Sequence, residues 1–366
     1  MNRVASWAAL ALLVALPWTT WIVLVPSLGQ DEALYTTPTY LFLLGMFLVT
    51  SLVVAWYDPW LGIFSAYMTV RALWTTTPFP ANGALHILLS SVAIVILQRT
   101  SEKYRRWASW MLVGSAGLEI LVALGQAFGV NPIWHGLQQD PFRVAHGTLG
   151  NSGHLGALVG ITFALVPGWL VPWWILGIVL SQSFAGAMAM LVVACMRWRQ
   201  QWGKLMVGTA AGLVALYLVR PFHLGTLGLR WLSWAFGGSL AWQAPIFGHG
   251  PKSWEPIVRA QQIARPDIFP ELFRYAHNEL LQLFFEAGLV GVVILFAWIC
   301  YHQAWKKPLL VALGVVAFWW PPFRVPTLLP ISILAIGLAG AQGAATSQEQ
   351  VRQPWFPFLD WKRWME

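Results

Sequence analysis

The chain has 366 residues, of which 58% are hydrophobic and only 10% are charged. A soluble domain carries about 25% charged residues, so the composition excludes an ordinary soluble protein and predicts an all-α, polytopic transmembrane helix bundle. The formal net charge of +8 would suggest a nucleic-acid partner in a soluble protein, but in a membrane protein it is first explained by basic anchors on cytoplasmic loops. The two cysteines, Cys195 and Cys300, provide no disulfide framework and no metal-ligand spacing.

A membrane span needs roughly 20 apolar residues, or fewer inside a bundle. The first apolar run begins at Ala5 and is too long for a signal-peptide core, so it is predicted to be a retained first span. By this criterion the chain has about twelve spans. They lie near residues 5–28, 39–56, 59–74, 84–98, 107–128, 153–168, 170–182, 184–197, 205–219, 278–302, 308–320 and 325–342. The run from Trp169 to Met196 could instead form one long kinked helix.

Clusters of basic residues test this topology. With a cytoplasmic N-terminus, the predicted spans place every cluster, and the C-terminus, on the cytoplasmic side, as the positive-inside rule requires. The clusters are Arg99, Lys103, Arg105 and Arg106; Arg197, Arg199 and Lys204; Lys306 and Lys307; and Lys362 and Arg363. The expected organisation is a single integral membrane domain over residues 1–343, followed by an amphipathic cytoplasmic tail over 344–366.

The same topology places two polar loops on the outer side of the membrane, at 129–152 and at about 220–276. The longer loop is predicted to be partly helical, and its basic residues exceed its acidic ones. The basic residues are Arg220, Arg230, Lys252, Arg259, Arg265 and Arg274; the acidic ones are Glu255, Asp267 and Glu271. A positive outer loop opposes the usual orientation trend, although long loops escape that rule. The excess predicts either a bound anion or merely a solvated loop.

In the shorter outer loop, Arg143 precedes a Gly147-Thr-Leu-Gly-Asn151 turn that leads into a predicted helix. Glycine-rich turns at helix starts can offer backbone N–H groups to phosphates. The turn is not a P-loop, because no Gly-Lys-Ser/Thr follows it. A turn at the membrane surface explains the same residues.

In the longer loop, the segment around Arg230 and Trp234 could form an amphipathic helix on the membrane surface. Further along, Pro245-Ile-Phe-Gly-His-Gly-Pro-Lys-Ser-Trp254 contains a tight glycine turn beside Lys252. Basic side chains beside glycine turns suit a diphosphate, and tryptophan suits a sugar face or a lipid interface. Each of these features alone is commonplace.

A His277-Asn278 pair stands where the long loop meets an apolar helix, with Arg274 close by in the sequence. The helix dipole discourages protonation of an imidazole there, so a neutral histidine could act as a base. Asn278 could orient it or bind a ligand oxygen, although Asn is also an ordinary N-cap residue. Glu286 lies about two and a half turns into the same predicted helix, where a carboxylate is costly unless it is paired.

Together these motifs resemble the O-antigen ligase and O-antigen polymerase superfamily. Residues His277 to Gly291 match its His-Asn-x-x-Leu-x-x-x-x-Glu-x-Gly-x-x-Gly pattern in full. Arg143 with Gly147–Asn151, and Arg230 and Trp234 with Pro245–Trp254, match its two arginine–glycine motifs. The chain departs from the family pattern at Gly153, where the family often has Asn. It departs again at Ser183-Phe-Ala-Gly186, which lacks an expected arginine.

The resemblance implies metal-independent transfer of a glycan from a polyprenyl diphosphate carrier to an acceptor hydroxyl, without a cofactor. The site would face the periplasm at a bacterial inner membrane, and the enzyme could be a ligase, a polymerase or a protein O-glycosylating enzyme. His277 would be the catalytic base, and Asn278 and Glu286 would support it. The residues implied to bind diphosphate are Arg143, Arg230, Lys252 and Arg274. The implied partners are the lipid-linked donor, a glycan or lipid A-core acceptor, and membrane lipid, but no nucleic acid.

Two other functions fit a polytopic chain. A transporter could line its path with intramembrane charges such as Glu286, but it should show paired broken helices in two related halves, and the sequence has no such symmetry. A structural subunit of a membrane complex that has lost the enzyme's activity is the second alternative. The departure at Ser183–Gly186 keeps that alternative open.

Overall fold

The computed structural model describes residues 38–73, 75, 80–130, 145–149, 151–198, 224–265, 268, 275–324 and 328–341. Within these ranges all regular structure is helical and no strand is present, so the all-α prediction is confirmed. The predicted spans 5–28 and 205–219 and the tail 344–366 lie outside the described residues. Residue contacts divide the chain into two compact units.

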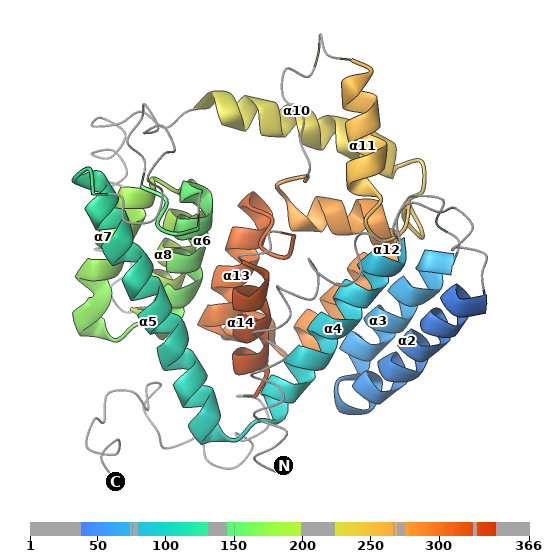
Figure 1. The fold of residues 1–366 in the computed structure, drawn as a ribbon, viewed down its shortest axis with the longest axis horizontal. Helices are drawn as coiled ribbons and strands as arrows, with labels where there is room; N and C mark the ends of the chain where they lie inside the picture. Colours follow the sequence, from blue (N-terminus) through green and yellow to red (C-terminus); the bar gives the residue numbers. More distant parts are fainter. Residues whose placement is uncertain are drawn as a thin grey trace. The chain divides into compact units, whose positions relative to one another are not determined.

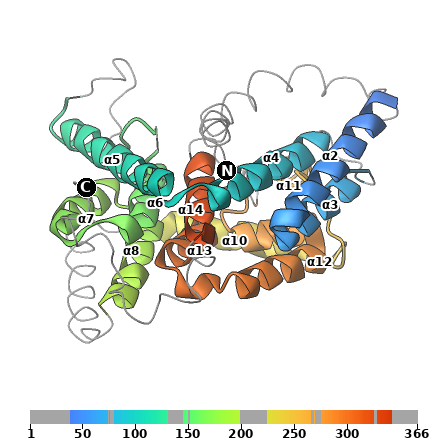
Figure 2. The ribbon, with the colours of Figure 1, turned by 90° about the horizontal axis from the view of Figure 1, so that it is seen from below.

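The first unit is built from the N-terminal helices and the long loop (Figure 1). It contains α2 (Pro38–Tyr57), α3 (Pro59–Leu73), most of α4 (Pro80–Arg99), α10 (Leu224–Ala241), α11 (Trp254–Ile263), α12 (Glu279–Tyr301) and the start of α14 (Leu329–Ala341). Three of these helices begin at a proline, whose fixed φ and missing N–H suit the first helical turn. α3 packs against both α2 and α12, and α10 packs against α12 (Figures 1 and 2). The long loop is therefore partly helical, as predicted.

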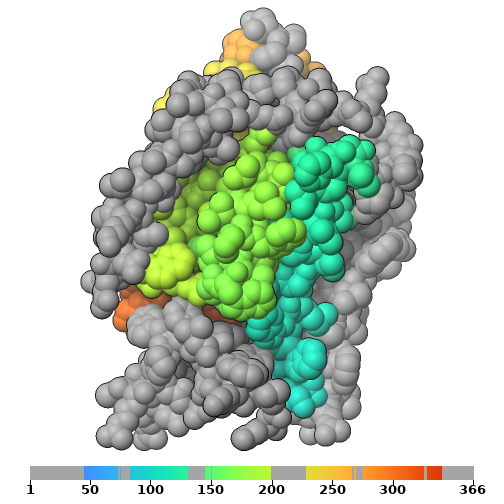
Figure 3. Space-filling model, turned by 90° about the vertical axis from the view of Figure 1, so that its left-hand side faces the viewer, coloured from blue at the N-terminus to red at the C-terminus, as the bar shows by residue number. Residues whose placement is uncertain are grey.

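The second unit holds the middle of the chain. It contains α5 (Glu102–Ala127), α6 (Ser152–Thr162), α7 (Val171–Ser181), α8 (Phe184–Arg197), most of α13 (Pro308–Trp319) and the rest of α14. Two 3₁₀ turns, Phe163–Leu165 and Gly168–Leu170, connect α6 to α7. α6 packs against α5, α7 and α8, and Figure 3 shows the face on which α5 lies beside the segment from α6 to α8.

The run from Trp169 to Met196 forms two short helices and not one kinked helix. Gln182 separates them in the left-handed region, with φ 51°. Ser183 then caps α8 by accepting a hydrogen bond from the Gly186 backbone N–H at 3.3 Å. Gly186 faces α6 so closely that a Cβ there would overlap the backbone of Gly156. The Ser183–Gly186 departure from the family pattern therefore serves helix capping and close helix packing in this chain.

The predicted spans 39–56, 59–74, 184–197 and 278–302 coincide with α2, α3, α8 and α12 to within one residue at each end. Among the described helices, α5 and α12 are long and apolar enough to cross a membrane by themselves. Shorter apolar helices of 10–17 residues overlap the predicted spans 39–56, 84–98, 153–168, 170–182, 184–197, 308–320 and 325–342.

The structure corrects the prediction of a continuous helix over 278–302. α12 is interrupted at Gly288, whose backbone angles, φ 62° and ψ −165°, are not helical. The glycine turn of the long loop fills this interruption and bonds to the backbone on both sides of it. The four hydrogen bonds run from His249 N–H to Phe285 O (2.9 Å), Gly250 N–H to Glu286 O (2.8 Å), Leu289 N–H to Pro245 O (2.8 Å) and Val290 N–H to Ile246 O (3.1 Å).

α3 secures this junction from the other side. The Tyr67 hydroxyl lies 2.9 Å from the carbonyl oxygen of Phe247 and 2.7 Å from that of Ala287. The Arg71 guanidinium donates to the Gly248 carbonyl at 2.7 Å. Two motifs that resemble the family pattern, 245–254 and 277–291, are thus joined to each other through backbone hydrogen bonds and to α3 through the side chains of Tyr67 and Arg71.

Replacing Gly288 with alanine is expected to destabilise the first unit by about 3 kcal/mol, because a Cβ there adds strain at positive φ and overlap with packed neighbours. That Cβ would overlap the backbone of Ile246 and Gly248. Gly238→Ala on α10 is the matched control, because its added Cβ meets nothing within 4 Å. Thermal unfolding in detergent measures both variants. Equal melting temperatures for the two would contradict the steric account of the junction.

Candidate functional site

Arg230 and His277 meet at Trp320 in the first unit. The Arg230 guanidinium carbon lies 5.3 Å from the centroid of the Trp320 ring, and the His277 ring centroid lies 5.2 Å from it. Arg230 also donates to the Trp319 carbonyl at 3.2 Å. A cation within about 6 Å of an aromatic centroid is attracted to the ring. Trp320 therefore holds the arginine of α10 near the histidine that precedes α12.

The backbone of Ala276, just before His277, is held on both sides. The Trp234 indole N–H donates to the Ala276 carbonyl at 2.6 Å, and the Ala276 N–H donates to the Gln282 side-chain oxygen at 3.2 Å. Trp234 itself packs edge-on against Phe318 at 6.0 Å between ring centroids. Because Ala276 is fully buried, these two bonds satisfy polar groups that water does not reach. They fix the chain immediately ahead of His277.

His277 has a strained backbone and an uncharged ring. Its φ of 52° lies in the left-handed region, which residues other than glycine adopt uncommonly and which is found at functional sites. Burial, and then the positive charge of Arg230, lower the pKa of His277 to about 4. The imidazole is therefore neutral at physiological pH, as a general base must be before it accepts a proton.

Asn278 is the N-cap of α12, and Glu286 is paired. The Asn278 side-chain oxygen accepts from the Leu281 N–H at 2.9 Å, as a capping residue does. The Glu286 carboxylate is only 1% exposed and accepts from Arg324 at 2.9 Å. Arg324 also reaches Glu279 at 3.3 Å. Burial alone would lower the pKa of Arg324, but Glu286 and Glu279 raise it, so the guanidinium stays charged.

Lys252 lies in a tight turn at the start of α11, with φ 59°. Its side chain is exposed and runs past the start of α4, where a Cβ at Gly83 would lie 3.3 Å from the Lys252 Cγ. Its charge is in electrostatic range of Arg324 and Glu286. Of the residues predicted to bind diphosphate, Arg230 is the one placed beside His277, while Arg143 and Arg274 lie outside the described residues.

In the second unit, the turn at Gly147 is fastened to α5. Gln126 accepts from the Gly147 N–H at 2.9 Å, and Glu119 accepts from the Thr148 N–H at 2.7 Å. Asn151 caps α6 by accepting from the Gly153 N–H at 2.7 Å. The expectation that this turn offers these N–H groups to a phosphate is therefore wrong, because side chains of the protein already bind them.

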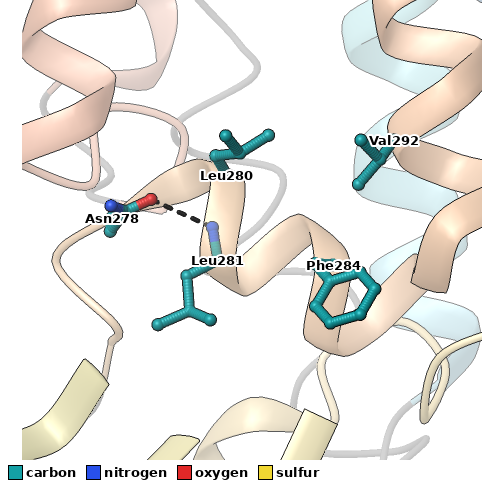
Figure 4. Close-up of a pocket in the computed structure, with 5 residues that line it drawn as sticks. All are labelled: Asn278, Leu280, Leu281, Phe284 and Val292. Atoms are coloured by element: carbon teal, nitrogen blue, oxygen red, sulfur yellow. Dashed lines mark hydrogen bonds between the residues drawn. The ribbon is translucent and has the colours of Figure 1, made fainter. Parts of the chain in front are cut away.

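An open groove of about 310 Å³ adjoins the start of α12 (Figure 4). It is mostly apolar, and in Figure 4 its lining side chains come from both segments of α12, before and after the Gly288 interruption. The lining residues are Asn278, Leu280, Leu281, Phe284 and Val292. Across the part of the chain that the structure describes, no three His, Cys, Asp or Glu side chains converge to hold a metal ion.

Sequence reasoning missed three residues of this site: Trp320, Arg324 and Gln282. Arg324 ends a short Pro-Pro-Phe-Arg turn between the last two predicted spans, and this turn falls on the outer side in the predicted topology. A lone arginine there, on the same side as His277, was the available signal. Trp320 and Gln282 gave none, because tryptophans are abundant in this chain and a Gln inside an apolar helix has many ordinary explanations.

Comparison with known proteins agrees with the motif pattern. Residues 147–296 match the protein family described as O-antigen ligase. This segment contains Arg230, Lys252 and both segments of α12 up to residue 296. No curated protein shows significant similarity to the chain. Residues 147–296 carry the Arg230–Trp234 helix, the glycine turn and the His277 motif. Their match to this membrane-integral family supports the resemblance to the superfamily of O-antigen ligases and O-antigen polymerases.

Proposed function

We propose that the protein transfers a glycan from a polyprenyl diphosphate carrier to an acceptor hydroxyl, with His277 as the general base. The observation that carries the proposal is the placement of a neutral imidazole and the Arg230 guanidinium within 5.3 Å of the same Trp320 ring centroid. A histidine provides the base, and an arginine provides a positive charge for a leaving diphosphate. The reaction needs both groups at one place.

His277 would remove the proton from the acceptor hydroxyl as its oxygen attacks the anomeric carbon of the donor sugar. A new C–O bond forms to the acceptor, and the C–O bond to the diphosphate breaks. General base catalysis typically contributes about 10²–10⁴-fold to a rate. The strained backbone and the buried ring of His277 support this role, because both are features of functional sites.

The leaving diphosphate keeps the electron pair of the broken bond and already carries negative charge. It therefore needs cations more than a strong acid, and a guanidinium can bind two of its oxygens at once. Arg230 would make this contact beside His277. We assign Lys252 and Arg274 as further cations for the same diphosphate, and Asn278 and Glu286 as supporting residues. Arg143 is proposed to bind diphosphate on the family resemblance alone.

The proposed setting is a bacterial inner membrane, crossed about twelve times, with both termini in the cytoplasm and His277 at the periplasmic face. The positive-inside distribution of the basic clusters supports this topology. The acceptor would be a glycan or a lipid A-core. The ligase, polymerase and protein-glycosylating forms of the reaction share this donor chemistry.

The purified protein in detergent is expected to transfer glycan from a polyprenyl diphosphate donor, and to do so equally well with and without EDTA. No metal is needed because Arg and Lys side chains neutralise the diphosphate. Release of polyprenyl diphosphate, followed by chromatography, measures turnover with a lipid A-core or a free glycan as acceptor. Absence of turnover with every acceptor would contradict the proposed function, and loss of turnover in EDTA would contradict metal independence.

A further inference from the structure

We propose that Arg324, Glu286 and Gln282 form a hydrogen-bonded relay that sets the orientation of His277. Arg324 is then a positioning residue for the transfer reaction, although its side chain acts through other groups. The inference rests on the proposed role of His277 as the base, and it adds residues that the family motif does not include.

The relay runs from the turn at 321–324 to the peptide that precedes His277. The Arg324 guanidinium donates to one oxygen of the Glu286 carboxylate at 2.9 Å, and the Gln282 side-chain amide donates to the other oxygen at 3.1 Å. The Gln282 carbonyl oxygen accepts from the Ala276 N–H at 3.2 Å. Each contact fixes the orientation of the next group, because a flipped Gln282 amide would lose its hydrogen bonds to Glu286 and to the Ala276 N–H.

Every inner member of the relay is shielded from water. Glu286 is 1% exposed, Gln282 is 3% exposed and Ala276 is fully buried. Water therefore cannot replace a lost partner, and an unpaired polar group at these positions is costly. Substitution of Arg324 should therefore alter the hydrogen bonds of Glu286 and Gln282, because water does not reach them to replace a lost partner.

Arg324 also holds the first segment of α12 at its start. Its Nε atom lies 3.3 Å from Glu279, and Glu279 accepts from the Phe323 N–H at 3.1 Å. Glu279 and Glu286 are seven residues apart, on one face of the segment before the Gly288 interruption. Because helical continuity is lost at Gly288, the rest of α12 does not by itself fix this segment. Arg324 ties both of its ends to the turn at 321–324.

A largely buried cluster of two carboxylates and one arginine is a weak source of stability, since the cost of removing the charges from water offsets their attraction. Such groups can instead specify one geometry among several. Here the cluster contacts the two ends of the segment whose first residues follow His277. Its position therefore favours a role in orienting the base.

The relay can be tested without an activity assay, by recording NMR spectra of the protein in detergent with ¹³C-labelled histidine imidazoles. The His277 signal is assigned by its loss in His277→Gln. Gln282→Leu and Arg324→Met are expected to shift this signal. The first removes the partner of the Ala276 N–H, and the second removes the guanidinium that holds Glu286 in place for Gln282. Asp58→Asn is the matched control. This substitution removes the charge of a buried carboxylate that binds Trp298 and His302 near the far end of α12. It should leave the chemical shift of the His277 signal unchanged.

Kinetics distinguish positioning from general destabilisation. Gln282→Leu and Arg324→Met are expected to lower kcat about 10–100-fold, as misplacement of a catalytic group does. The KM for the donor and the acid limb of the pH profile should stay unchanged, because Arg230 and not Arg324 sets the charge around His277. Adding Glu286→Gln to Arg324→Met should recover part of kcat, since a glutamine can still accept from Gln282 and removes the unpaired buried charge.

An unchanged His277 signal in folded Gln282→Leu protein would overturn the relay, and so would an unchanged kcat in that variant. Gln282→Leu removes no charge, so it tests the relay even where Arg324→Met fails to fold. If the wild-type protein shows no transfer, the proposed function fails while the NMR comparison still decides the relay.

Discussion

His277→Ala is expected to lower kcat by at least about 10²-fold, the lower end of what a general base contributes. Donor binding should be retained, because the cations around the diphosphate are untouched. Binding of a radiolabelled polyprenyl diphosphate glycan and single-turnover transfer separate the two effects. Turnover at the wild-type rate would remove His277 from the mechanism.

His302→Ala is the control for this loss. His302 follows α12 in the same unit and lies 2.9 Å from the buried Asp58 carboxylate, so the substitution also removes a partly buried histidine. It has no proposed part in the transfer. We expect His302→Ala to affect thermal stability and to leave kcat near the wild-type value once the protein is folded.

Arg230→Ala is expected to weaken donor binding about 10–100-fold, the effect of losing a charged hydrogen-bond partner of about 1.5–3 kcal/mol. It should also move the acid limb of kcat/KM to higher pH. Arg230 is one of the two causes that hold the pKa of His277 near 4; without its charge the imidazolium is favoured and the pKa rises. Burial remains, so the pKa should stay below the ordinary value of about 6.5.

The pH profile of the wild-type protein should show the same electrostatic effect of Arg230 on His277. A bound diphosphate offsets the positive field of Arg230, so the acid limb of kcat should lie at higher pH than that of kcat/KM. Arg230→Lys should keep the wild-type acid limb and lose only part of the affinity. Arg259→Ala, which removes an arginine paired with Glu255 on the surface of α11, should change neither quantity. An unmoved acid limb in Arg230→Ala would refute the electrostatic coupling.

The helices could be predicted because the residues that determine their ranges lie within or next to each helix in the sequence. Apolar runs bounded by polar residues set the ranges of α2, α3, α8 and α12, and prolines mark the starts of α2, α3 and α4. Asn278 was recognisable as a candidate cap from residue type alone. The number of spans was not settled in the same way, since two predicted spans lie outside the described residues.

The interruption of α12 was not predictable from the sequence of the helix. A glycine in an apolar helix is usually read as a site of close packing, and Gly288 breaks the helix only because the turn at 245–250 supplies partners for the freed backbone groups. Residues 255–276 separate the two motifs along the chain. Their pairing is a tertiary event, so neither motif reveals it alone.

Residues of the site could be predicted where their side-chain chemistry points to a function. They could not be predicted where only their three-dimensional position does. His277 and Arg230 stood out by type and position, and they lie together at Trp320. The partner of Glu286 was expected in general terms, but Arg324 follows it by 38 residues along the chain. Its contact depends on how the turn at 321–324 meets α12, which no local pattern encodes.

The left-handed backbone of His277 also bears on how this chain could change over evolutionary time. Glycine and asparagine adopt that conformation more easily than histidine does, so either would relieve strain at this position while removing the imidazole. Selection for folding alone would favour such a replacement, and only selection for the chemistry opposes it. A descendant that serves merely as a subunit of a membrane complex would be free to lose the histidine first. The residue at this single position thus records whether a lineage still depends on the reaction.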